Sequence, residues 1–153
     1  MLVGGVSVRM EIRSSKLAEL YDYWHGKRPA PGRRPSRGRL DPLDIPAILP
    51  SVMLIEMGAQ PEEMRFRLIG TRIVERVGRD LTGHRLSEGF WGPLTAHYIA
   101  RYWAIFRAGE PVVSMRDLLG SDGKRHIYEQ ILLPLDPDDR YRGMLLAGLD
   151  FQD

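Results

Sequence analysis

The stretch of sequence that decides the fold runs from Arg65 to Leu86 and reads RFRLIGTRIVERVGRDLTGHRL. Its first six residues alternate in character, with a period of two that predicts a half-buried antiparallel strand. One face of this strand is expected to carry Phe66, Leu68 and Gly70, and the other Arg65, Arg67 and Ile69.

A short helix and a tight turn follow this strand. Thr71 can cap the helix, whose apolar stripe is Ile73, Val74 and Val77. The turn from Gly78 to Gly83 has glycines at its ends, where a positive φ is expected. A strand that leads into short helices lying across a sheet predicts an α+β domain.

Further strands and one long helix flank this stretch. The longest helix is predicted to open at Gly92-Pro93 and to end at Gly109, near residue 108. Asp122-Gly123 predicts a hairpin turn between two strands. The other strands expected are Ser51–Met57, Val112–Leu119, His126–Leu135 and Met144–Phe151, so the order is β-β-α-α-β-β-β.

The composition of the 153 residues is that of a globular protein, with 43% hydrophobic and 27% charged residues. No apolar run approaches the roughly 20 residues of a membrane span, and the first residues lack the pattern of a signal peptide. Cysteine is absent, which excludes disulfides and thiolate chemistry. These features predict a cytoplasmic chain that does not contact a membrane.

The first forty residues divide into three parts ahead of a domain expected at 41–153. Residues 1–10 show little pattern and are expected to be loose. Residues 11–26 predict an amphipathic helix with Ser14 or Ser15 as its cap. Its apolar stripe, in the i, i+3, i+4, i+7 spacing, is Leu17, Leu20, Tyr21 and Trp24. This stripe either forms a two-fold interface in a homodimer or covers the chain's own sheet.

Residues 27–40 are rich in Pro and Gly and predict an extended basic linker. Its six positive charges, with no acidic residue among them, are Lys27, Arg28, Arg33, Arg34, Arg37 and Arg39. Because the whole chain has a net charge of only +2, the remainder is acidic overall. Specific nucleic-acid binding through residues 27–39 is disfavoured, since no groove-entering helix or interleaved aromatic residue accompanies these charges.

Three passages in order carry a resemblance to a known family. They are DPLDIPAILPSVMLIEM at Asp41–Met57, the stretch quoted above, and YEQILLPL at Tyr128–Leu135. Together they resemble the PAS domain, and more narrowly a family of small stand-alone PAS proteins common in alphaproteobacteria. The resemblance implies a five-stranded antiparallel sheet with helices on one face, and a role in sensing or protein–protein signalling.

The resemblance also implies where a ligand would lie, between the sheet and its covering helices. That space is expected to be lined by Ile73, Val77, Leu81, Tyr98, Tyr102, Met115 and Tyr128. The alternative is that these side chains simply fill a core. The flavin–cysteinyl adduct of photosensory PAS domains is excluded without cysteine, and no other cofactor is indicated.

Haem is disfavoured as well. His97 lies on the long helix that carries the haem ligand in oxygen-sensing PAS domains, but it precedes the stripe residue Tyr98 and so points about 100° away. His25, His84 and His126 lack partners at metal-ligand spacing, and Ser87-Glu88 beside His84 lacks triad spacing. We therefore expect no metal site and no catalytic residue.

These observations predict a sensory module that binds a small ligand or a protein partner and has no catalytic output of its own. One alternative is a protein–protein adaptor with a filled core and no ligand. A second is an auxiliary nucleic-acid binder that uses residues 27–39.

Overall fold

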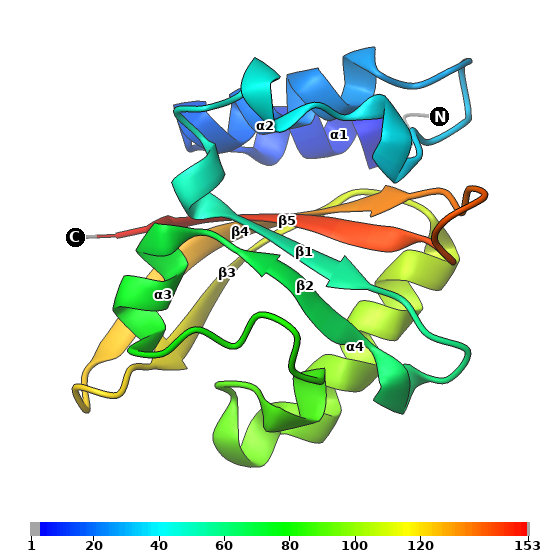
Figure 1. The fold of residues 1–153 in the computed structure, drawn as a ribbon. Coiled ribbons are helices and arrows are strands. Elements are labelled where there is room, and N and C mark those ends of the chain that lie inside the picture. The colour runs from blue at the N-terminus through cyan, green and yellow to red at the C-terminus, as the bar shows by residue number, and fades with distance from the viewer. Residues whose placement is uncertain (1–3, 153) are drawn as a thin grey trace.

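The computed structural model describes the backbone of residues 4–152 and the side chains of residues 8–152. Five antiparallel strands form one sheet in the order β2-β1-β5-β4-β3 (Figure 1). They are β1 Val52–Glu56, β2 Arg65–Ile69, β3 Val112–Leu119, β4 Arg125–Leu135 and β5 Met144–Phe151. The predicted order of strands and helices from residue 52 to residue 151 is confirmed.

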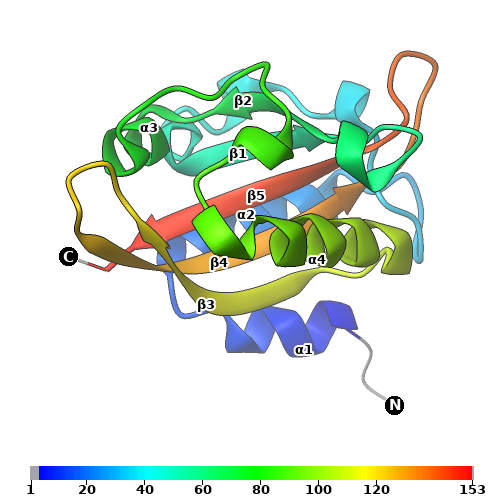
Figure 2. The ribbon, with the colours of Figure 1, turned by 90° about the horizontal axis from the view of Figure 1, so that it is seen from below.

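Helices lie on both faces of the sheet. The inner face is covered by α3 (Thr71–Val77) and α4 (Thr95–Ala108), and the outer face by α1 (Gly4–Glu11) and α2 (Ser15–Gly26). Figures 1 and 2 show the two pairs on opposite sides of the strands. Each face has its own hydrophobic core, so the sheet is buried on both sides.

The strict alternation predicted for β2 is wrong. A β-bulge lies where Leu54 pairs with Leu68 but the next residue, Ile55, pairs with Phe66, so that Arg67 is the extra residue. As a result Phe66 packs in the inner core and Leu68 against the outer one. One strand therefore supplies apolar side chains to both layers.

The expectation that residues 1–10 are loose is wrong for the described part, because Gly4–Glu11 forms α1; residues 1–3 lie outside the described residues. The next helix begins one turn later than position 11, at Ser15. Its cap is Ser14, whose Oγ accepts a hydrogen bond from the backbone N–H of Leu17 at 3.1 Å.

Two carboxylates anchor the junction between α1 and α2 to the sheet. Glu129 on β4 accepts hydrogen bonds from the backbone N–H groups of Arg13 and Ser14, at 2.9 and 2.8 Å. Asp150 on β5 accepts one from the Ser14 hydroxyl at 2.6 Å. A glycine on β5, Gly148, lets the helix approach the strands closely.

Residues 27–40 form a strap held by its own cations. Arg34 forms an ion pair with Asp136 at 2.7 Å, and Asp136 in turn bonds through its backbone N–H to the carbonyl of Pro35. Side chains of the other cations also bond within the chain, to carboxylates or backbone carbonyls: Lys27, Arg28, Arg33, Arg37 and Arg39. The segment is therefore more fixed than an extended linker.

Candidate ligand cavity

Six of the seven residues expected to line a pocket are buried in the inner core. Each is at most 5% exposed and packs between the sheet and its covering helices: Ile73, Val77, Leu81, Tyr98, Tyr102 and Tyr128. Val77 and Tyr98 also border a cavity of the inner layer. The centre of the predicted pocket is thus occupied by side chains.

The seventh residue, Met115, is placed wrongly by the prediction. It is 49% exposed and faces the outer side of the sheet, where it borders a shallow depression beside Met10 and Arg13. Side chains alternate between the two faces of β3, and Met115 belongs to the set that faces outward. Leu118 belongs to the inward set and is buried in the inner core. Leu118 therefore takes the role expected of Met115.

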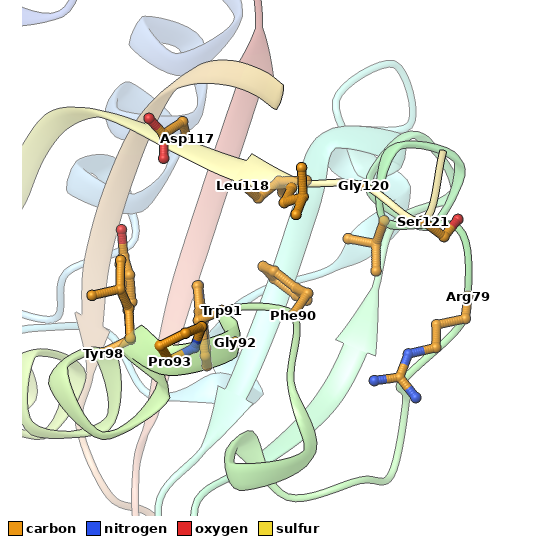
Figure 3. Close-up of a pocket in the computed structure, with 13 residues that line it drawn as sticks. Arg79, Phe90, Trp91, Gly92, Pro93, Tyr98, Asp117, Leu118, Gly120 and Ser121 are labelled. Carbon is orange, nitrogen blue, oxygen red and sulfur yellow. The ribbon is translucent and has the colours of Figure 1, made fainter. Parts of the chain in front are cut away.

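A cavity of about 400 Å³ lies at one end of the inner layer, within the range of roughly 300–1,000 Å³ for small-molecule sites. Figure 3 shows Trp91 and Tyr98 on one side and Gly120, Ser121 and Arg79 on the other. Its lining is Val77, Arg79, Phe90, Trp91, Gly92, Pro93, Leu94, Tyr98, Asp117, Leu118, Leu119, Gly120 and Ser121. Most of these side chains are apolar or aromatic.

One wall of the cavity is fixed by a contact between the end of α3 and the β3–β4 turn. The backbone N–H of Ser121 donates to the carbonyl of Val77 at 3.1 Å. Gly78 has φ +95, and a side chain there would collide with Ser121. Glycine is required here because it permits both the left-handed conformation and the close approach.

The opposite wall is built from aromatic rings. Trp91 stacks on Tyr98, with centroids 5.0 Å apart and planes 11° from parallel, and meets Tyr102 edge-on at 5.5 Å. Phe90 contacts Trp91 at 4.9 Å. Such ring pairs contribute roughly 0.5–1.5 kcal/mol each beyond the area they bury, so they stabilise this arrangement of the wall.

Buried polar atoms without a partner in the described part of the chain accompany these rings. They are Trp91 Nε1, Arg101 Nε, Tyr128 Oη and Gln130 Oε1. Leaving a buried donor or acceptor unpaired costs about 1–3 kcal/mol. Arg101 lies on α4 and Tyr128 and Gln130 lie on β4, so these atoms form a layer between the helix and the sheet that meets the cavity at Trp91.

Two tyrosines in this layer have shifted pKa values. Burial raises the pKa of Tyr102 to about 12, although Gln130 donates a hydrogen bond to its hydroxyl at 2.8 Å. Burial also raises the pKa of Tyr128 strongly. Both hydroxyls are therefore neutral at physiological pH and can serve as hydrogen-bond donors.

The histidines make no metal site among residues 8–152, where no group of three His, Asp or Glu side chains is placed to hold a metal ion. His97, the residue considered for haem, is exposed on α4 and forms a T-shaped ring pair with Tyr98. His84 bonds Glu88 at 3.1 Å, and His126 bonds Asp122 at 3.3 Å.

The apolar stripe of the N-terminal helix covers the chain's own sheet. Its four members are at most 4% exposed and belong to the outer core: Leu17, Leu20, Tyr21 and Trp24. The indole N–H of Trp24 donates to the carbonyl of Pro134 at 2.9 Å. This placement contradicts the use of these residues as a subunit interface, because no area is left for a partner to contact.

Sequence reasoning missed several residues that build the cavity, above all Phe90, Trp91 and Arg79. A signal for the first two was present, since two adjacent aromatic residues directly before Gly92-Pro93 sit where a helix begins. Arg79 has no such signal, because the turn that carries it reads as an ordinary polar loop.

The fold and the cavity together define a class of protein: a five-stranded antiparallel sheet with helices α3 and α4 between its second and third strands, and space for a ligand beneath them. The family model for the PAS domain matches residues 12–149. The chain belongs to the PAS domain family, and the match includes α2 and the strap.

Solved structures share this fold at low sequence identity. The PAS domain of an HTR-like protein from Haloarcula marismortui has a TM-score of 0.51 at 15% identity, with 66% of this chain and 79% of that chain covered. The Rhodobacter sphaeroides LOV protein gives 0.51 at 13%, with 73% and 68% covered. The light state of the Aureochrome1 LOV photoreceptor gives 0.52 at 8%, with 70% and 84% covered. No curated protein matches the chain significantly.

None of the helices described between residues 4 and 152 is long and apolar enough to cross a membrane.

Proposed function

We propose that this PAS domain is a sensory module that binds a small molecule in the cavity beside Trp91 and has no catalytic output of its own. One observation carries the proposal: an apolar, aromatic-lined cavity adjoins a layer of buried polar atoms that lack partners within the described chain. Trp91 belongs to both. A ligand entering there gains apolar contacts and hydrogen bonds together.

Strand β4 offers a route from this cavity to the N-terminal helices. Its consecutive residues Tyr128, Glu129 and Gln130 alternate between faces. Tyr128 and Gln130 face the inner layer, where the side-chain amide of Gln130 donates a hydrogen bond to the hydroxyl of Tyr102. Glu129 faces the outer side, where its carboxylate accepts the hydrogen bonds that hold the α1–α2 junction. A ligand that repacks the inner layer therefore biases the docking of α1 and α2, through which the signal reaches a protein partner.

The alternative is an adaptor without a ligand, and the complete burial of Ile73, Tyr102 and Tyr128 favours it. A homodimer stays a prediction, with a surface other than the stripe of α2. Nucleic-acid binding through residues 27–39 is the weakest proposal, because their side chains already bond within the chain.

Native mass spectrometry of the purified protein, compared with the same sample denatured, tests the ligand proposal. A non-covalent mass that disappears on denaturation supports it. The variant Val77→Phe fills the cavity from α3 and should lose that mass. Val74→Phe makes the same change one turn earlier on α3, at a half-buried residue that does not line the cavity, and should keep it. A ligand-free spectrum for every variant favours the adaptor.

A further inference from the structure

The cavity has a chemical preference that follows from the polar side chains of its lining. Arg79 offers guanidinium donors, Ser121 offers a hydroxyl, and Asp117 is the lining carboxylate. Figure 3 shows Asp117 on the far side of β3 from the aromatic residues. There its carboxylate forms an ion pair with Arg125, so the lining presents no unpaired acceptor carboxylate to a ligand.

Arg79 stands at the mouth of the cavity, and its guanidinium points toward the side of Phe90 and Trp91 (Figure 3). One of its nitrogens, Nη2, donates to the carbonyl of Glu88 at 3.1 Å, which holds the side chain across the loop. Arginine has five N–H donors, so most of them stay available after this bond.

No carboxylate forms an ion pair with Arg79 in the described part of the chain, and its acidic neighbours are engaged elsewhere. Asp80 accepts hydrogen bonds from the backbone N–H and hydroxyl of Thr82, at 2.9 and 2.7 Å. The Glu88 carboxylate bonds His84 and the backbone N–H of Arg85, both at 3.1 Å. No ion pair among the described residues therefore occupies the guanidinium at the mouth.

The body of the cavity is lined by apolar and aromatic side chains. Leu118 and the ring of Phe90 face it together with the stacked pair of Trp91 and Tyr98. Such a surface favours an aromatic ring or a branched hydrocarbon. The indole N–H of Trp91 has no partner among the described residues and can only donate, so this group also favours an acceptor on the ligand.

We infer that the cavity takes a small apolar carboxylate, with its ring or hydrocarbon part against Trp91 and its carboxylate on Arg79. This inference rests on the proposed function and adds the chemical class of the ligand. A guanidinium–carboxylate contact is geometrically matched and can be bidentate. Cations, including protonated amines, are disfavoured because the positive charge of Arg79 would repel them.

Calorimetric titration of the full chain with three matched probes tests the class of ligand. The probes are phenylacetate, phenylacetamide and phenethylamine, which share a ring and differ in charge. We expect phenylacetate to bind most tightly and its affinity to fall with added salt. For Arg79→Gln we expect a dissociation constant at least about tenfold higher, the loss typical of a charge-assisted hydrogen bond.

Arg65→Gln is the matched control. Arg65 is also exposed and also holds a loop carbonyl, that of Gly83 at 3.1 Å, but it does not line the cavity. The Arg65→Gln variant should bind phenylacetate with the affinity of the wild type. Both variants should show the circular dichroism spectrum of the native protein.

The outcomes separate the class of ligand from the existence of a site. If phenylacetamide and phenylacetate bind equally well, or if Arg79→Gln binds phenylacetate as tightly as the wild type, the inference that the ligand is a carboxylate is wrong. The proposal that the cavity binds a small molecule is not affected by this result. A neutral or cationic molecule found bound in the native mass spectrum would also contradict the carboxylate inference and would support the existence of a ligand site. If no probe binds and the native spectrum is ligand-free, both the inference and the proposed ligand function fail.

Discussion

Glu129 lies on β4 beneath the junction of α1 and α2, and its replacement by alanine should remove about 3 kcal/mol from the free energy of unfolding. The side chain is only 4% exposed and accepts two backbone hydrogen bonds, from Arg13 and Ser14. Hydrogen bonds to a charged group contribute roughly 1.5–3 kcal/mol each. Because the two donors are partly buried, water replaces some of the loss, and the lower end of the range applies.

A loss of this size is large against the roughly 5–15 kcal/mol that stabilises a typical domain. It corresponds to a fall in melting temperature of about 6–12 °C for a chain of this length. Urea unfolding followed by tryptophan fluorescence and far-ultraviolet circular dichroism measures the free energy. Hydrogen exchange should also show faster opening of α1 and α2 than of β4.

Two variants control this prediction. Glu129→Gln keeps one acceptor oxygen and should lose about half as much as alanine. Glu19→Ala removes an exposed glutamate from α2 and should change the free energy of unfolding by at most about 0.5 kcal/mol. A Glu129→Ala protein that unfolds at the same urea concentration as the wild type would refute the role given to this carboxylate.

Three further predictions concern the two layers. Gly148→Ala should destabilise the protein by about 1–3 kcal/mol in urea unfolding, because the added carbon would lie 2.7 Å from two leucine side chains of α2; an unchanged midpoint would mean that α2 lies farther from the sheet. Trp24→Phe should cost about 1–2 kcal/mol, since it leaves the Pro134 carbonyl without its donor; a neutral result in the same assay would contradict that bond. The pKa of Tyr102 is raised to about 12, above its unfolded value of about 10. Its contribution to stability is therefore complete below about pH 10 and is lost as the pH rises through 12. An absorbance titration of tyrosinate checks this, and ionisation of every tyrosine near pH 10 in the folded protein would contradict it.

The order of elements could be predicted because each carries its own local signal. Gly109 ends α4 with φ +74, and Gly123 turns the β3–β4 hairpin with φ +79, as the positions of both glycines in the sequence suggested. The bulge at Arg67 could not be predicted, because RFRLIG alternates as a regular strand would. Its cause lies in the pairing with β1, which is a long-range property.

Two of the seven residues expected to line a pocket, Val77 and Tyr98, border the cavity, and Met115 lies on the opposite face of the sheet. On β3 the inward and outward sets of residues both mix polar and apolar side chains, so the sequence pattern of VVSMRDLL does not fix which set faces the core. Leu118 is buried in the inner core, whereas Met115, which was expected there, is exposed on the other face. Phe90 and Trp91 form a wall only because the loop before α4 folds over Tyr98, and no local rule gives that contact.

The apolar stripe of α2 shows a second limit of prediction from sequence. Its spacing correctly predicted four buried residues, but spacing alone does not tell whether the cover is a second subunit or the chain's own sheet. The deciding feature is Gly148, more than a hundred residues later in the sequence, which allows Leu17 and Leu20 to reach the strand. The sequence of the helix alone does not predict a contact with a residue so far along the chain.

The most direct test of the proposed site is a nitrogen–proton correlation NMR spectrum recorded while phenylacetate is added. The chain has three tryptophans, so their indole N–H signals can be assigned from single Trp→Phe variants. Trp91 borders the cavity, whereas Trp24 is bonded to Pro134 on the other face of the sheet. The Trp91 indole signal should shift and saturate while that of Trp24 stays in place. A Trp91 signal that does not move at saturating phenylacetate, or a shift confined to Trp24, would contradict the proposed site.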